Sequence, residues 1–155
     1  MDRIDYALLT LLQEDSRRTA DKLGEELGLS RSAVTRRIQN LTQEGVIEKE
    51  VAVLSEGFRR SRVSAIVNVQ LDRHQPQEAD QFRRAIRSLP EVQICVMITG
   101  ASDALMLVSV RDMDRFNIFA DQLASMPLVR RYETSFIKRT VKFTTAVPLE
   151  WIDPT

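Results

Sequence analysis

Residues 19–41 read TADKLGEELGLSRSAVTRRIQNL and contain two short helical patterns joined at Gly28. The apolar residues that recur at helical spacing are Leu23 and Leu27 in the first pattern and Val34, Ile38 and Leu41 in the second. Residues three and four positions apart share one face of a helix, so each pattern buries a single stripe. The stretch therefore predicts a helix-turn-helix.

The second of these helices is expected to begin after Ser30, a residue type that caps helices well. No acidic residue occurs between Ser30 and Gln43, and the face opposite the apolar stripe is basic and polar. In this motif the second helix lies in the major groove of DNA. We expect contacts to base edges from Arg31, Ser32, Thr35, Arg36 and Gln39.

Two more residues are predicted to contact DNA outside the base edges. Arg37 lies nearer the flank of the domain, which favours a phosphate contact. Thr19 begins the first helix as its N-cap and is expected to bond a phosphate as well. The alternative for all these residues is an ordinary solvated helix face, and capping alone would explain Thr19.

The sequence on either side extends the motif to a small domain. A helix is predicted from about residue 2 to residue 14, with the apolar stripe Ile4, Leu8, Leu11 and Leu12. Gly45 suits the end of the second helix of the motif, and the valines of residues 46–53 indicate a short extended wing. Residues 1–54 are thus predicted to form a winged helix-turn-helix domain that binds double-stranded DNA.

The composition is that of a globular protein, with 43% hydrophobic and 28% charged residues in a chain of 155. Lys and Arg number 22, as do Asp and Glu. This neutrality weighs against DNA binding, because no bulk charge draws the chain to phosphates. Any affinity for DNA must come from local placement, as in the acid-free helix.

Several functional classes lack the residues that they need. Cys95 is the only cysteine and lies in an apolar run, which predicts a core thiol, no disulfide and a reducing compartment. The chain shows neither a signal peptide nor an apolar run of about 20 residues, so we expect a cytoplasmic protein that binds no membrane. Without a Ser-His-Asp set, a metal-spaced Cys/His cluster or a glycine-rich phosphate loop, we expect no catalytic residue, no metal and no cofactor.

The second half of the chain has a different pattern. A strand-like run, VSAIVNVQL, is followed by a helix that opens at Pro76, and VQICVMIT and DALMLVSV form a hairpin around Gly100. A second helix, from about 112 to 125, precedes the last strand, LVRRYETSFIKRTVKF. The order βαββαβ is that of a ferredoxin-like domain. We therefore predict an α+β protein with a linker at residues 55–62 and the ferredoxin-like domain at 63–155.

The middle strands of the predicted sheet are apolar on both faces, although two helices cover only one face. In the second strand of the hairpin, Leu105 and Leu107 alternate with Met106 and Val108. An uncovered apolar face favours aggregation, so we expect a second copy to cover it in a two-fold homodimer. We place Met106 and Val108 in that contact. The alternative is a cover within one chain, from the N-terminal domain or from the C-terminal tail with Trp151.

Two stretches follow the motifs of one family in register. DRIDYALLTLLQEDSR is similar to the opening LDxxDxxILxxLQxDaR, and GLSRSAVTRRIQNLTQEGVI is similar to GLSxxxvxrRixrLexxGvI. With the second half, they make nearly the whole chain resemble the Lrp/AsnC family of transcriptional regulators. The resemblance implies a DNA-binding homodimer, often assembled into an octamer, whose affinity for its operator responds to a small effector, commonly an amino acid.

The resemblance also implies an effector site where the hairpin turn meets the last strand, at a contact between dimers. Its expected residues are Gly100, Ala101, Ser102 and Asp103 of the turn, with Thr134 and Ser135 of the strand. The family's loop reads GDxDYL, whereas GASDAL stands here, so Ala101 and Ala104 replace an aspartate and an aromatic residue. An ordinary hairpin turn is the alternative. We expect a weak response to amino acids.

The linker departs from the family as well. Ser55, Glu56 and Arg60 stand where the family tends to have Asn-Pro and a later glycine. Arg59 and Arg62 add positive charge beside them. These arginines predict either a changed hinge or added phosphate contacts.

Two other function classes remain open at this point. Sirohaem decarboxylases share the two-domain architecture, which makes an enzyme the main alternative, but their chemistry relies on histidines near the central cleft. The single histidine here, His74, falls in the polar turn LDRHQPQ, which argues against that reading. The third class is a structural oligomer that binds no DNA.

Overall fold

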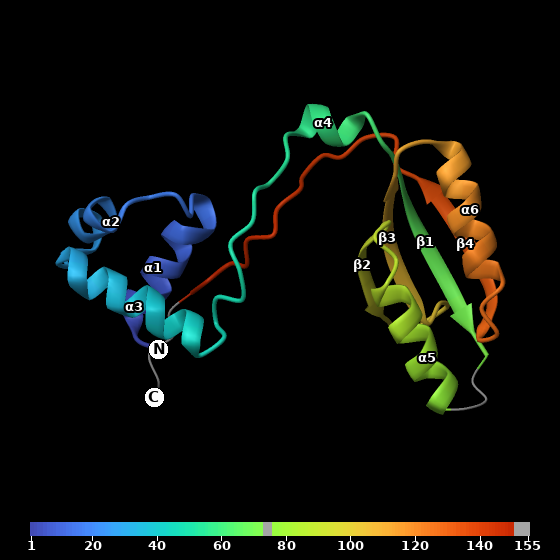
Figure 1. The fold of residues 1–155 in the computed structure, drawn as a ribbon, viewed down its shortest axis with the longest axis horizontal. Helices are drawn as coiled ribbons and strands as arrows, with labels where there is room; N and C mark the ends of the chain where they lie inside the picture. The colour runs from blue at the N-terminus through green and yellow to red at the C-terminus, as the bar shows by residue number, and fades with distance from the viewer. Residues whose placement is uncertain (73–75, 151–155) are drawn as a thin grey trace. The chain divides into compact units, whose positions relative to one another are not determined.

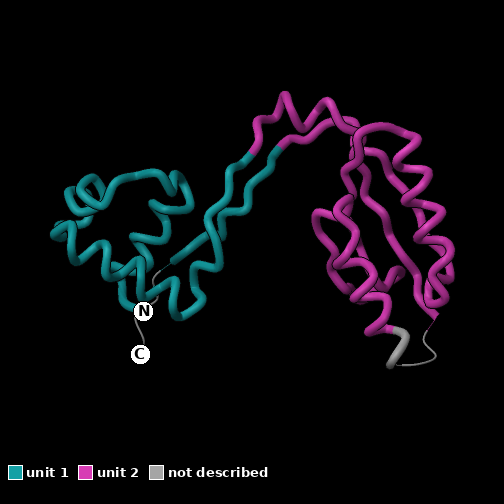
Figure 2. Tube along the Cα trace, viewed as in Figure 1, with its two compact units in different colours: residues 1–53, 142–155 teal, residues 54–141 magenta. Residues whose placement is uncertain are grey.

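The computed structural model describes residues 1–72 and 76–150, which fall into two compact units (Figure 2). The first unit contains Met1–Val53 together with the chain from Lys142 on, and the second contains Leu54–Val141. The predicted linker thus belongs to the second unit. The predicted C-terminal domain, in turn, extends beyond the second unit, because the tail returns to the helices of the first. Trp151 lies outside the described residues.

Three helices build the first unit: α1 (Arg3–Glu14), α2 (Ala20–Leu27) and α3 (Arg31–Gln43). Their N-caps are Asp2, Thr19 and Ser30, and each cap side chain accepts a backbone N–H of the first turn. Their apolar stripes meet in one core, Leu8, Leu9, Leu23, Val34 and Leu41. The predicted helix-turn-helix is confirmed.

The turn between α2 and α3 needs glycine at two positions. Gly28 ends α2 in the left-handed region at φ 67°, which few other residues adopt without strain. Gly24 is buried, and a Cβ there would lie 2.5 Å from the carbonyl oxygen of Leu29. The N–H of Leu29 donates to the Gly24 oxygen at 2.9 Å. The turn is therefore packed too closely for any side chain at Gly24.

A network of charged groups joins the start of α1 to the middle of α3. The N–H of Asp5 donates to the Asp2 carboxylate at 2.9 Å, and the N–H of Asp2 donates to Asp5 at 2.8 Å. Arg37 Nη1 lies 2.6 Å from Asp5 Oδ1 and 2.9 Å from Asp2 Oδ2. The Asp5 backbone bond, helped by Arg37, holds the pKa of Asp2 below its ordinary value. A helix cap of α1 is thereby also the contact that fixes α3.

The predicted wing is not a strand in the structure. Residues 46–54 carry no strand assignment, and Val51 and Val53 are exposed. An extended segment becomes a strand only where a neighbour bonds to its backbone, and the four strands of the described sheet all lie in the second unit. This segment instead lines a groove beside α1.

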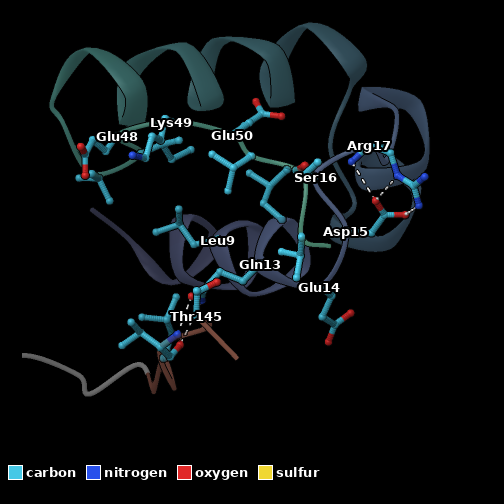
Figure 3. Close-up of a pocket in the computed structure, with 18 residues that line it drawn as sticks. Leu9, Gln13, Glu14, Asp15, Ser16, Arg17, Glu48, Lys49, Glu50 and Thr145 are labelled. Carbon is cyan, nitrogen blue, oxygen red and sulfur yellow. Dashed lines mark hydrogen bonds and ion pairs between the residues drawn. The ribbon is translucent and has the colours of Figure 1, made fainter. Parts of the chain in front are cut away.

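The C-terminal tail completes that groove (Figure 3). Gln13 on α1 exchanges two hydrogen bonds with the backbone of Val147, accepting its N–H at 2.6 Å and donating to its oxygen at 3.1 Å. Leu149 packs against the core of the three helices. The residues of the tail that line the groove are Thr145, Val147 and Leu149. The tail is therefore a structural part of the unit that carries the helix-turn-helix.

The second unit begins with a short helix, α4 (Glu56–Arg60), and continues as the predicted βαββαβ domain (Figure 1). Its elements are β1 (Val63–Leu71), α5 (Pro76–Arg87), β2 (Val92–Met97), β3 (Ala104–Val110), α6 (Met113–Ala124) and β4 (Val129–Phe136). The strands form one antiparallel sheet in the order β2-β3-β1-β4. The predicted fold class is confirmed. Among the described helices, none is both long and apolar enough to cross a membrane.

Strand register decides which residues of β3 face the helices. Met106 and Val108 are fully buried in one core with Phe119 and Leu123 of α6. The prediction that Met106 and Val108 contact a second copy was wrong, because both side chains face the helices of their own chain. Side chains alternate along a strand, so Leu105 and Leu107 lie on the other face of the sheet. Ladder partners on that face form what we call the open apolar patch: Ile66, Ile94, Val96, Leu105 and Leu107.

Cys95 also departs from its prediction as a core thiol. It lies on β2 opposite Met106, and its side chain is exposed. The strand order places β2 at the edge of the sheet, where most of its residues are exposed. An apolar run on an edge strand is therefore not evidence of burial.

Docking of the tail predicts unequal effects of two neighbouring alanine substitutions. Leu149→Ala should destabilise the first unit by about 1–2 kcal/mol, because it removes a partly buried side chain from that core. Val147→Ala is the control, since this side chain is 62% exposed and the bonds to Gln13 use only its backbone. Thermal unfolding of the full chain measures both. Equal losses would contradict the docked tail.

Candidate DNA-binding face and effector hollow

One face of α3 is exposed, and its buried face packs into the core through Val34 and Leu41. The predicted base-contacting residues are all exposed: Arg31, Ser32, Thr35, Arg36 and Gln39. Because α3 carries no carboxylate from Arg31 to Gln43, this face presents only donors, hydroxyls and amides. Arginine can donate two N–H groups to guanine, whereas the glutamine amide can donate to N7 of adenine and accept from its amino group.

Three residues near the start of α3 already have local partners. The hydroxyls of Ser30 and Ser32 lie 3.1 Å apart, and Thr35 Oγ1 donates to the Arg31 oxygen at 2.9 Å. Arg31 Nη1 lies 3.6 Å from Asp21 Oδ2, and both side chains are mostly exposed. Exposed ion pairs contribute at most about 1 kcal/mol, so Arg31 can exchange this partner for DNA at little cost.

Arg37 and Thr19 have structural roles that the sequence patterns did not separate from DNA contact. The guanidinium of Arg37 is committed to Asp5 and Asp2 and is only 26% exposed. Thr19 Oγ1 accepts the N–H of Lys22 at 3.3 Å, as an N-cap does. The structure thus gives Arg37 carboxylate partners inside the unit, and its phosphate contact stays a prediction.

A hollow of about 370 Å³ lies beside the hairpin turn of the second unit. Its lining residues are Gln70, Leu71, Asp72, Gly100, Ala101, Asp103 and Arg130. Three of the predicted effector residues therefore line one cavity, and Gly100 adopts φ 136° there. Asp72 and Arg130 supply one charge of each sign. Sequence reasoning missed both, although antiparallel pairing of the first and last strands would have placed the start of the last strand here.

Asp103 is anchored to the end of β1. Its N–H donates to the Val69 oxygen at 2.9 Å, and its carboxylate accepts the N–H of Leu71 at 2.9 Å. Gln70 Nε2 adds a bond of 2.9 Å to the oxygen of Ala101. These bonds hold the turn against the strand, so Asp103 has a structural role whether or not it touches a ligand.

Of the other three predicted effector residues, Ser102 does not line the hollow, and two lie elsewhere on β4. Thr134 is opposite Val67 and Ser135 is opposite Ile66, several ladder positions from the turn, which adjoins the end of β1. Within one chain, the structure does not bring them to the hollow. In the described part of the chain, Thr134 Oγ1 is buried and has no hydrogen-bond partner.

Within residues 1–72 and 76–150, no group of three or more His, Cys, Asp and Glu side chains could hold a metal ion. His74 lies outside the described residues.

Comparisons with known proteins agree with both halves of the structure. A family model of the AsnC-type helix-turn-helix domain matches residues 1–42, and one of the Lrp/AsnC ligand binding domain matches residues 64–147. An uncharacterised HTH-type transcriptional regulator of Sinorhizobium fredii is 34% identical over 151 residues, which cover 97% of this chain and 89% of that protein.

Two solved structures share the fold. An AsnC family transcriptional regulator from Agrobacterium tumefaciens is similar with a TM-score of 0.87 and 30% identity, covering 96% of this chain and 97% of that one. A transcriptional regulator from Neisseria meningitidis in complex with L-Met has a TM-score of 0.87 and 31% identity, covering 96% of each chain. These relatives are transcriptional regulators rather than enzymes. The chain belongs to the Lrp/AsnC family of transcriptional regulators.

Proposed function

We propose that this regulator reads a specific duplex DNA sequence with the exposed face of α3 and works as a homodimer in the cytoplasm, without catalysing a reaction. The observation that carries the first part is the carboxylate-free face of α3. A net charge of zero leaves local placement as the source of affinity, and this helix supplies it. The operator itself is found by selecting bound sequences from random duplexes.

Arg36 and Arg37 are neighbours in the sequence with opposite expected roles. Arg36→Gln should weaken binding to the selected operator by roughly 1–3 kcal/mol relative to random DNA, as the loss of one base contact does, and leave the melting temperature unchanged. Arg37→Gln should lower the melting temperature instead, because buried Asp5 loses its charged partner. Titration of both duplexes, with thermal unfolding, measures the pair. Equal losses on operator and random DNA would reassign Arg36 to a phosphate.

A second copy of the chain is the proposed cover of the open apolar patch. Ile94 and Val96 are 48% and 44% exposed, and Leu105 and Leu107 adjoin them across the ladder. Of the tail, the described residue Leu149 packs with the helices of the first unit. Joining two such faces about a two-fold axis buries both patches at once. Several dimers assembled into an octamer would extend the same arrangement.

A charge in the open apolar patch should break the dimer. Leu107→Glu is expected to give monomers, because a carboxylate buried without a partner costs several kcal/mol. Ile118→Glu is the matched control, since Ile118 is a similarly apolar residue, 45% exposed, on α6. Equilibrium sedimentation of the full chain distinguishes monomer, dimer and octamer. A Leu107→Glu variant that stays dimeric would place the interface elsewhere.

The hollow beside the hairpin turn is the proposed effector site. Arg130 can pair with a carboxylate through two N–H groups, and Asp72 can pair with an ammonium. The family's aspartate and aromatic residue are replaced by Ala101 and Ala104, which leaves fewer groups to hold an amino acid. We therefore expect weak binding, made through Arg130.

L-Methionine is the probe, because one similar structure contains it. It should raise the melting temperature only slightly. A ligand at a hundred times its dissociation constant adds about 2.7 kcal/mol to the free energy of unfolding, and we expect L-methionine to add much less. Arg130→Gln should remove the shift, whereas Arg131→Gln should keep it, since Arg131 pairs with Glu133 at 2.6 Å and does not line the hollow. A shift that survives Arg130→Gln would exclude this carboxylate site.

A further inference from the structure

One end of the sheet in the second unit gathers positive charge. Val63 at the start of β1 is opposite Val110 at the end of β3, and the Ser64 oxygen accepts the N–H of Ile137 at 2.8 Å. The start of β1 and the ends of β3 and β4 therefore meet. The basic residues next to these strand ends, or on α4 just before β1, form what we call the hinge-end basic cluster: Arg59, Arg60, Arg62, Arg111, Lys138 and Arg139.

Three members of this cluster form no ion pair with any acidic residue that the structure describes. Arg60 pairs with Glu56, and Arg111 Nε lies 2.7 Å from Asp112 Oδ2. In the parts of the chain that the structure describes, no ion pair joins Arg62, Lys138 or Arg139 to an acidic residue. Their side chains are exposed, and the guanidinium of Arg62 donates to the Ser109 hydroxyl at 3.3 Å. In a chain of zero net charge, this is a local excess that favours a polyanion.

Chain connectivity ties this end of the sheet to the DNA-binding unit. The second unit begins at Leu54 and ends at Val141, so both of its connections leave close to the cluster. Residues 46–54 span at most about 30 Å even when fully extended. Duplex DNA carries one negative charge for each ~1.7 Å of its axis, so phosphates flanking a bound operator lie within such a reach.

The geometry points to a second DNA contact, in which the hinge-end basic cluster binds phosphates of the duplex that flanks the operator. The inference rests on the proposed DNA binding by α3 and adds a surface outside the helix-turn-helix. Phosphate contacts carry no sequence information, so this surface strengthens binding to operator and random DNA alike. It also explains how a chain without net charge holds a polyanion.

The test compares two double variants that each remove two arginine charges. Arg62→Gln with Arg139→Gln should lower the slope of log affinity against log salt by about 2, close to 0.9 for each lost phosphate contact. At about 0.1 M salt, that decrease in slope corresponds to a loss of affinity of roughly ten- to a hundredfold, for operator and random duplexes alike. Arg84→Gln with Arg87→Gln, both exposed on α5, is the matched control and should keep the slope. Arg62→Lys with Arg139→Lys should restore it.

Each result has a defined reading. An unchanged slope in the Arg62 and Arg139 double variant overturns the inference, and so does an equal fall in the control. A loss confined to the operator also overturns it, because phosphates are the same in both duplexes. If the unaltered chain binds DNA and Arg36→Gln impairs operator binding, these failures leave the proposed function standing. A chain that binds no duplex at all overturns both.

Discussion

The bonds of Arg37 to Asp5 and Asp2 are the interaction on which the DNA-binding unit depends most. They cross from α3 to the first turn of α1, and Asp5 is the one charged residue that is buried in the part of the chain that the structure describes. A buried carboxylate is stable only with a partner, so the geometry of α1 and α3 is set together. The orientation of the exposed face of α3 is thereby fixed by an ion pair on its opposite side. Arg36 is exposed on α3, whereas the next residue, Arg37, is held by its pairing with Asp5 and Asp2.

Helices and strands of this chain were predictable because their signals are local. Caps such as Ser30, a turn glycine at Gly28 and apolar residues at helical spacing decide an element within a few residues. The βαββαβ order followed from the same signals. The exposed residues of α3 were predictable for the same reason, since a helix with one apolar stripe exposes the other face.

What the sequence did not predict depends on information that the local sequence does not hold. Met106 and Leu107 are both apolar, so alternation shows that they face opposite sides without showing which side the helices cover. Arg36 and Arg37 look alike until Asp5 is placed beside one of them. The pairing of Gln13 with Val147 joins positions at opposite ends of the chain and leaves no pattern at either. Thr134 and Arg130 differ only in strand register, which decides which of them reaches the hollow.

The return of the tail to α1 has a consequence for how the protein is made. A ribosome releases the three helices of the first unit early, but Val147, which bonds to Gln13, follows that residue by 134 positions in the chain. The unit that carries the helix-turn-helix is therefore discontinuous in the chain and cannot be completed until the whole of the second unit has been synthesised. The ferredoxin-like unit, whose residues are continuous in the chain, can fold before it. A chain that stops after the second unit would thus have an intact sheet and an unfinished DNA-reading unit.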